Sequence, residues 1–284
     1  MTLCPAAPNT GIIFNRTDLD PEVASIDANW KNIHSGILCT TLANQEGQTV
    51  GTIEHLMAAL CGCGIDNVVI DLNGPEVPIM DGSASPFISL IECAGIIEQD
   101  FPRKYIRVLK HVFVSDGSGS MHLRPSDNLR INFEIDFASN VVAHQEYLSN
   151  VTEKSFKNDL GGARTFGFVD QIEAMRELGY GRGGSLDNAV IVDGDKILNE
   201  GGLRFSDEFV RHKVLDCLGD MYLAGGPILG EITGIRSGHS LSHKLLRSLL
   251  CDETAWCFGT NDDFLTNDRL KGNTQLMPPI AATA

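Results

Sequence analysis

The segment FVRHKVLDCLGD carries one imidazole and two carboxylates at helical spacing. Asp216 follows His212 by four residues and Asp220 lies one turn further on, so a helix would place all three on one face. Phe209 and Cys217 share that face, which predicts that it points inward. A buried row of this kind is costly unless it is paired or binds a metal, and histidine and aspartate are both zinc ligands. An exposed ion pair on the protein surface gives the same short pattern. A second source of ligands elsewhere in the sequence would favour a metal site over such an ion pair.

The segment TIEHLMAAL supplies this second source. Glu54 and His55 are adjacent, and neighbouring helix residues point about 100° apart, so His55 would bind a metal while Glu54 takes a proton from the attacking water. Together with His212 and Asp216, His55 would leave the fourth position of a tetrahedral zinc open, as in catalytic sites. His239, in the turn RSGHS, would act with a carboxylate partner as an acid or stabilise an oxyanion.

The elements expected around these residues alternate between strands and helices. Ser206 is expected to cap the helix that carries His212, and the GGP sequence at residues 225–227 ends it. Thr52 is expected to cap a helix over residues 53–60. Further helices are expected over residues 87–94, 152–160, 169–178 and 241–250, and strands over residues 67–72, 105–114, 121–124, 129–137, 189–192 and 228–235, before an irregular tail from residue 251. This order predicts an α+β fold.

Composition limits the functional classes. The chain has 284 residues, which suits one large domain or two smaller ones, and its net charge is −15. This charge disfavours nucleic-acid binding, although a few local cations would still hold one phosphorylated small molecule. Neither a secretory signal nor an apolar run of the about 20 residues needed to span a bilayer is evident. The eight cysteines are therefore expected to be reduced thiols in the cytoplasm. Cys61 and Cys63 lack the partner pair that a cysteine metal site needs.

Longer motifs carry a resemblance to a known family. The sequence resembles the LpxC family, the zinc-dependent UDP-3-O-acyl-N-acetylglucosamine deacetylases of lipid A synthesis, in the stretches TIEHLMAALCGCGIDNVVIDLNGPEVPIMDGSASPF, ARTFGF, LNEGGLRFSDEFVRHKVLDCLGD and SGH. The resemblance implies a cytoplasmic, monomeric enzyme that binds Zn²⁺ and a UDP-3-O-acyl-N-acetylglucosamine, with no nucleic-acid partner and no transmembrane segment. It also implies two layered α+β domains, at residues 1–100 and 104–284, with the active site between them and a β-α-β insert at about residues 165–198.

The resemblance further implies roles for single residues. The implied zinc ligands are His55, His212 and Asp216. The implied catalytic residues are Glu54 as general base, His239 facing the oxyanion or the leaving amine, Asp220 holding His239, and Thr165 at the tetrahedral intermediate. The implied substrate-binding residues are Lys213 at the sugar-diphosphate, Asp136 and Phe137 near the uracil, Arg236 at the nucleotide, Phe168, Val169 and Ile172 along the acyl passage, and Ile37 and Leu38 close to that site.

The chain departs from the family in two places. Family members usually begin further upstream, so the chain is expected to lack a first edge strand, to be less stable than a longer form and to associate more readily. A basic residue of the family falls in the turn SDGSGS, where this chain has Gly119 or a neighbouring serine. That difference removes one candidate phosphate contact.

Two other functions stay open at this point, namely hydrolysis of another acylamino sugar and non-catalytic binding of a UDP-sugar. Metal content and acetate release would distinguish them from the deacetylase. The glycine-rich sequence at residues 179–184 is expected to form a hairpin or a flexible edge, because no Lys-Ser/Thr pair follows it as in a phosphate loop. No functional role is expected for the remaining histidines, which are His34, His111, His122, His144 and His243.

Overall fold

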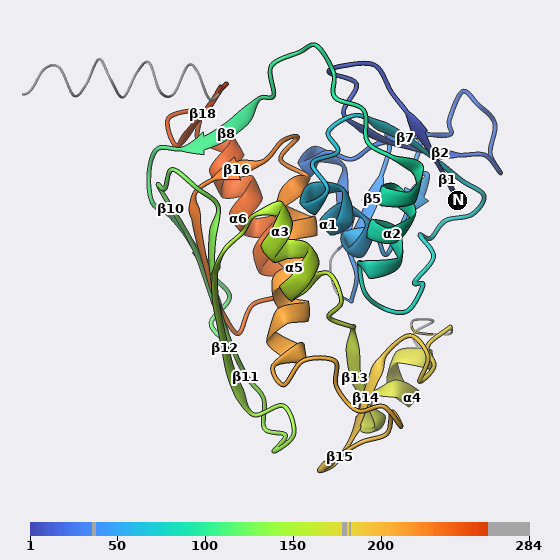
Figure 1. Ribbon diagram of the computed structural model, residues 1–284, viewed down its shortest axis with the longest axis vertical. Coiled ribbons are helices and arrows are strands. Elements are labelled where there is room, and N and C mark those ends of the chain that lie inside the picture. The colour runs from blue at the N-terminus through green and yellow to red at the C-terminus, as the bar shows by residue number, and fades with distance from the viewer. Residues whose placement is uncertain (36–37, 178–180, 182, 261–284) are drawn as a thin grey trace, which may run out of the picture.

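The computed structural model describes residues 1–35, 38–177, 181 and 183–260. Within these residues, two main sheets flank a layer of helices (Figure 1). Strands and helices are mixed along the chain, which confirms the α+β class predicted from the sequence. No helix in the described part of the chain is both long enough and apolar enough to cross a membrane.

The first main sheet is built from the N-terminal part of the chain. Its strand order is β1-β7-β2-β3, and β7 pairs in parallel with β2 and antiparallel with β1. The strands are β1 (Thr2–Pro5), β2 (Ile12–Arg16), β3 (Ser25–Asp27) and β7 (Val68–Leu72). A short 3-10 helix η1 (Trp30–Asn32) leads into a small sheet of β4 (Ile33–Ser35), β5 (Thr41–Ala43) and β6 (Thr49–Val50). The helices of this part are α1 (Glu54–Gly62) and α2 (Ser85–Ala94).

The second main sheet has the order β12-β11-β17-β10-β9 and brings together strands from both ends of the later chain. Its strands are β9 (Val112–Ser115), β10 (Ser120–Arg124), β11 (Arg130–Asp136), β12 (His144–Asn150) and β17 (Glu231–Ile235). Two long helices pack on its inner face, α5 (Glu208–Tyr222) and α6 (His239–Cys251). A turn of helix α3 (Glu153–Ser155) continues into a π-helix η2 (Phe156–Leu160), with Thr152 as the N-cap.

Two smaller units complete the described chain. In the first, β13 (Phe166–Phe168) pairs in parallel with β14 (Val190–Asp193), α4 (Val169–Glu177) connects them, and β15 (Lys196–Ile197) follows. In the second, β8 (Tyr105–Val108) lies between β16 (Ile228–Leu229) and β18 (Trp256–Gly259). The first unit projects from the helical layer at the bottom of Figure 1.

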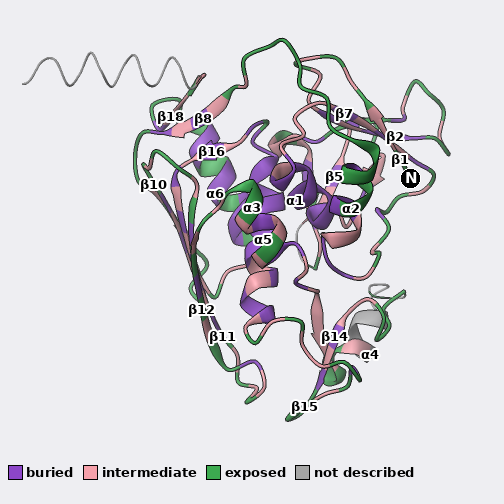
Figure 2. Ribbon diagram, viewed as in Figure 1, coloured by how far each residue is buried: buried purple, intermediate pink, exposed green. Residues whose placement is uncertain are grey.

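The centre of the molecule is the contact between α1 and α5. Both helices are buried along most of their length (Figure 2). Their backbones approach closely at Gly219, where a Cβ atom would lie only 2.1 Å from the carbonyl oxygen of Glu54. A side chain at this position would therefore push α1 away from α5. A second close approach lies at Gly62, whose missing side chain leaves room for the ring of Phe156.

Several helix starts differ from the sequence-based expectation. Thr52 does not cap α1, because its backbone has φ 55° and its hydroxyl donates to Glu76 Oε1 at 2.6 Å, so that Ile53 precedes the helix. Asp207, rather than Ser206, holds the N-cap position of α5. His239 is the first residue of α6 and does not lie in a turn.

Three strand predictions also need correction. The expected strand over residues 105–114 is two strands, β8 and β9, which belong to different sheets. The strand over residues 228–235 is interrupted at Gly230, where a Cβ would meet Val108 and Leu123 at 2.9 Å and 3.0 Å. The tail is not irregular throughout, because β18 pairs with β8. Apolar content predicted extended chain in the first two stretches, but it carries no information on the change of pairing partner.

The buried apolar side chains form one continuous cluster that includes residues from both main sheets and all the central helices. The division at residues 100–104 therefore stays a prediction. The same holds for the missing first strand, since β1 and β3 are the edges of the first sheet among the described residues. Half of the glycine-rich sequence at 179–184, namely residues 179, 180 and 182, lies outside the described residues, as does residue 178.

Candidate metal and catalytic site

The contact of α1 with α5 brings three ligand-type side chains together. His55 comes from the first turn of α1, and His212 and Asp216 come from one face of α5. Each residue offers one ligand atom, and these atoms lie within 4.8 Å of one another. We call these three residues the metal triad. All three side chains are buried, with 4%, 2% and 6% exposure.

The unpaired polar atoms of the metal triad favour a cation between its members. Asp216 Oδ1 lies 3.5 Å from His55 Nε2 and 3.3 Å from His212 Nε2. Within the described chain, this buried oxygen has no hydrogen-bond partner, and the same is true of His55 Nδ1. An unpaired buried carboxylate oxygen is costly, and two imidazoles with one carboxylate are a common donor set for zinc. The residues therefore fit a divalent metal with a preference for nitrogen and oxygen ligands.

A backbone carbonyl fixes the orientation of His212. Its Nδ1 donates to the carbonyl oxygen of Ala163 at 3.1 Å, so Nε2 faces the other two members of the metal triad. Burial lowers the pKa of His212 to about 4, against the opposing effect of Asp216. The imidazole is therefore neutral at physiological pH, as a metal ligand must be.

The loop that supplies Ala163 is itself held by a buried ion pair. Arg164 Nε donates to Glu208 Oε1 at 2.8 Å, and its backbone N–H donates to the same oxygen at 3.0 Å. Glu208 is fully buried in the first turn of α5 and also accepts from the backbone N–H of Arg204. The helix that carries His212 is thereby tied to the loop that orients it.

A second group of charged residues lies next to the metal triad. Glu54 and His239 face each other with 3.8 Å between Oε1 and Nε2, and both are buried. Burial raises the pKa of Glu54, although His239 and His55 oppose the shift. His239 Nδ1 donates to Asp220 Oδ2 at 2.8 Å. This geometry places a carboxylate of raised pKa and an imidazole with its own carboxylate partner on either side of one point.

The charge of His239 is determined by opposing effects. Burial lowers its pKa, but Asp220 and the other nearby carboxylates outweigh burial and raise it to about 9. For Asp220, burial opposes ionisation, while the charge of His239 and hydrogen bonds to it keep the pKa below its usual value. The pair is therefore imidazolium with carboxylate at neutral pH. A protonated imidazole can donate a proton to a leaving group.

Two neighbours of this group were not foreseen. Thr40 is fully buried, and its hydroxyl lies 2.5 Å from Asp220 Oδ1 and 3.0 Å from His243 Nε2. No functional role was expected for His243, which α6 places one turn after His239 and 3.5 Å from Asp220. The i, i+4 spacing of His239 and His243 is a signal that could have found the second histidine.

Aromatic rings continue from the metal triad toward the β13–α4 unit. Phe166 lies 6.4 Å from the ring of His212, 5.8 Å from Phe137 and 6.2 Å from Phe168 between ring centroids. Phe209 packs against Phe166 at 5.0 Å. We call these four phenylalanines the aromatic row. Phe166 joins the row to the triad, although only its neighbours in ARTFGF were singled out from the sequence.

The other candidate residues lie around this centre. Lys213 Nζ donates to Asp216 Oδ2 at 3.4 Å. Thr165 is held by backbone bonds to Gly82 and Val190, two residues after Ala163. The remaining candidates are less buried and comprise Asp136 at the end of β11, Arg236 in the turn before α6, Val169 and Ile172 in α4, and Leu38 before β5. Ile37 lies outside the described residues.

The turn that contains Gly119 has a structural reason for its glycine. A Cβ at Gly119 would lie 2.3 Å from the carbonyl oxygen of Arg236. The two turns therefore touch, and Arg236 itself has φ 45°. A side chain at residue 119 would displace the turn that precedes His239.

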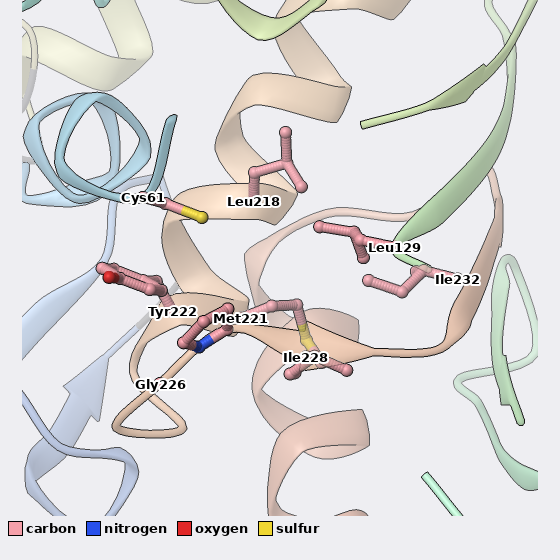
Figure 3. Close-up of a pocket in the computed structure, with 9 residues that line it drawn as sticks. Cys61, Leu129, Leu218, Met221, Tyr222, Gly226, Ile228 and Ile232 are labelled. Carbon is pink, nitrogen blue, oxygen red and sulfur yellow. The ribbon is translucent and has the colours of Figure 1, made fainter. Parts of the chain in front are cut away.

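Two cavities lie beside the C-terminal turns of α5, and none of the metal triad lines them. The smaller is apolar and holds about 10 Å³ between α5, Cys61 and the second sheet, as Figure 3 shows for Leu218 and Ile232. At this size it is at the limit for one water molecule. The larger holds about 180 Å³ and is lined by polar residues that include Asp27 and Asp66. Neither cavity belongs to the catalytic group.

Comparison with known proteins decides the family. Residues 1–251 match the LpxC family, described as UDP-3-O-acyl N-acetylglycosamine deacetylase. The chain belongs to the LpxC family. It is therefore a deacetylase, a hydrolase that acts on an amide, and its family works in lipid A biosynthesis. The metal triad is the candidate metal site of this metalloenzyme family.

Similar proteins align with nearly the whole chain. It is 47% identical over 265 residues to the UDP-3-O-acyl-N-acetylglucosamine deacetylase of Haemophilus influenzae strain 86-028NP, which covers 93% of this chain and 87% of that one. The enzyme of the same name from Pasteurella multocida strain Pm70 is 48% identical with the same coverage. The one from Shewanella oneidensis is 47% identical over 258 residues, 90% of this chain and 84% of that one.

Proposed function

We propose that this chain removes the N-acetyl group of a UDP-3-O-acyl-N-acetylglucosamine, using one Zn²⁺ held by the metal triad. The names of its relatives support the substrate. The observation that carries the proposal is the meeting of the metal triad with Glu54 and His239 at one buried point, with 3.8 Å between Glu54 Oε1 and His239 Nε2. A UDP-linked substrate supports a cytoplasmic location, and we expect a monomer.

The proposed reaction divides the acid–base work between two residues. When bound, Zn²⁺ polarises the amide carbonyl as a Lewis acid. Glu54 takes a proton from the attacking water, and its raised pKa suits a general base. His239 gives its proton to the amide nitrogen as the C–N bond breaks, so that acetate is released and a free 2-amine remains on the sugar. Asp220 keeps His239 oriented and charged through the 2.8 Å hydrogen bond at Nδ1.

The remaining residues are proposed to bind the substrate. Thr165 would hydrogen-bond the tetrahedral intermediate, and Lys213 would contact the sugar-diphosphate. The acyl chain would follow the aromatic row toward the β13–α4 unit, because this row is a group of apolar side chains that begins beside His212. The residues proposed to complete the acyl passage are Phe168, Val169, Ile172 and Leu38. Those proposed for the nucleotide site are Asp136, Phe137 and Arg236.

The proposed domain division follows from the central helix contact. Residues 1–100 would form one α+β domain and residues 104–284 the other, with a β-α-β insert at about residues 165–198. Its support is that α1 and α2 lie in the same part of the chain as the strands of the first sheet, while α5 and α6 pack on the second sheet. In this division each domain contributes one part of the metal triad.

The test is acetate release by the purified, metal-loaded chain from UDP-3-O-acyl-N-acetylglucosamine. Glu54→Gln and His239→Ala should each lower kcat by about 10²–10⁴, the usual contribution of a general acid or base, while metal content stays unchanged. Matched controls are Glu253→Gln and His144→Ala, since both side chains are exposed. Near-normal turnover in either site variant would remove that residue from the mechanism. Substrate binding without acetate release by the unaltered chain would instead favour a non-catalytic UDP-sugar protein.

A further inference from the structure

We propose that Thr40 and His243 are positioning residues that hold the general base and the general acid at a fixed distance and orientation to each other. The inference rests on the proposed roles of Glu54 and His239. It concerns a buried hydrogen-bond network that reaches from Thr40, the residue before β5, through Asp220 to the second turn of α6. Neither Thr40 nor His243 was assigned a role from the sequence.

Thr40 uses each of its polar groups for a different catalytic element. Its backbone N–H donates to Glu54 Oε2 at 3.0 Å. Its hydroxyl donates to Asp220 Oδ1 at 2.5 Å. Its carbonyl accepts from the N–H of Ile53, the residue that precedes α1, at 3.4 Å. One residue therefore contacts the base, the partner of the acid and the start of the helix that carries the base.

The direction of each hydrogen bond follows from the donor inventory. An ionised carboxylate only accepts, so the single hydroxyl proton of Thr40 goes to Asp220. Thr40 Oγ1 must then accept from His243 Nε2, which lies 3.0 Å away. By the same rule His239 Nδ1 donates to Asp220 Oδ2. The network thus places a proton on His243 Nε2 and on His239 Nδ1, and it leaves His239 Nε2 for the substrate.

The position of Asp220 depends on this network. Asp220 is 1% exposed, so bulk solvent does not reach its second oxygen. His239 donates to Oδ2, the donor at Oδ1 is Thr40, and His243 Nε2 lies 3.5 Å from Oδ1. Without these contacts at Oδ1 the carboxylate could rotate. Because His239 is hydrogen-bonded to the same carboxylate, its imidazole would change orientation as well. Because Thr40 also holds Glu54, the same residue sets the 3.8 Å separation between base and acid.

The test removes one group at a time and measures kcat, KM and metal content of the metal-loaded, full-length chain. Thr40→Val keeps the shape and the backbone N–H but lacks the hydroxyl, and it should lower kcat by about 10- to 100-fold, the usual cost of losing a group that orients a catalytic side chain. KM and metal content should stay within about twofold. Thr40→Ser restores the hydroxyl and should recover most of kcat. Thr41→Val is the matched control, because Thr41 is adjacent and its hydroxyl contacts Cys39 instead.

The second arm tests the other end of the network. His243→Leu should lower kcat, and His243→Gln should recover part of it, because the glutamine amide can donate where Nε2 did. The Thr40→Val and His243→Leu losses should be less than additive when combined, since both act on Asp220. Wild-type kcat in Thr40→Val, or a loss that Thr40→Ser does not recover, would overturn the proposal. If Thr40→Val does not fold, the two His243 variants decide the point. Failure of Glu54→Gln to lower kcat would count against the proposed function itself.

Discussion

Replacing Gly219 by alanine is the sharpest test of how the site is assembled. The new Cβ would lie 2.1 Å from the carbonyl oxygen of Glu54, 2.9 Å from its carbonyl carbon and 3.1 Å from the backbone nitrogen of Ala58. All three are backbone atoms of α1, so no side chain can move aside to relieve the contact. The helix has to move away from α5 as a unit and take Glu54 and His55 with it.

The expected size of the effect follows from that displacement. An ordinary carbon–oxygen contact needs about 1 Å more room, and a misplacement of about 1 Å can cost a catalytic site about 10²-fold in rate. Overpacking of a core costs typically about 1–3 kcal/mol. Alanine has a better helix propensity than glycine by up to about 1 kcal/mol, so propensity alone predicts the opposite sign. We therefore expect a net loss of stability of about 1–2 kcal/mol, together with a fall in kcat.

The assays are acetate release, metal content and thermal unfolding at a fixed metal concentration. For a chain of this size each kcal/mol lowers Tm by about 2–4 °C. Gly201→Ala is the matched control, because no atom lies within 4 Å of the new Cβ and the residue is exposed. A Gly219→Ala variant with unchanged kcat and a raised Tm would refute the reasoning, since propensity would then outweigh the helix contact.

Three further predictions concern the metal, an ion pair and the acyl group. His212→Ala should lower the bound metal well below one ion per chain, whereas His239→Ala should retain it; equal metal content in both by elemental analysis would sink the triad assignment. Arg164 and backbone donors outweigh burial and lower the pKa of Glu208, so its stabilisation is present above the unfolded pKa of about 4.3 and is lost as pH falls through the lower folded value. Glu208→Gln should therefore destabilise strongly at pH 7 and less below about pH 4 in urea unfolding; an equal difference at both pH values would contradict this. Removing the 3-O-acyl group from the substrate should lower kcat/KM, since each buried CH₂ contributes about 0.8 kcal/mol. Phe166→Ala should reduce this dependence on the acyl group, and equal turnover of acylated and deacylated substrate would exclude an acyl passage along the aromatic row.

Local patterns predicted the parts of the site that lie on regular helices. The i, i+4 spacing of His212 and Asp216 and the neighbouring Glu54 and His55 needed only helix geometry to be placed on defined faces. The meeting of the two helices could not be derived from spacing, because it depends on the close approach at Gly219. A glycine inside a helix indicates some constraint, yet the sequence does not say which backbone approaches it.

Contacts between segments that are far apart in the sequence were the part that sequence reasoning missed. Thr40 lies outside any periodic element and reaches Asp220 across 180 residues of sequence. His243 has helical spacing from His239, but its partner is again this threonine. The split of residues 105–114 into β8 and β9 has the same origin, because apolar alternation reports burial and does not report which strand lies alongside.

The metal triad takes its ligands from two helices that are far apart in the sequence and belong to different sheet layers. Ion binding and the docking of α1 on α5 are therefore thermodynamically linked, because a ligand set that exists only in the docked state stabilises that state. At a free ion concentration of about 100 times Kd the linkage contributes about 2.7 kcal/mol. The melting temperature of this protein should therefore depend on the free metal concentration in the buffer. A chelator should weaken the same contact between α1 and α5 that a side chain at residue 219 would disrupt.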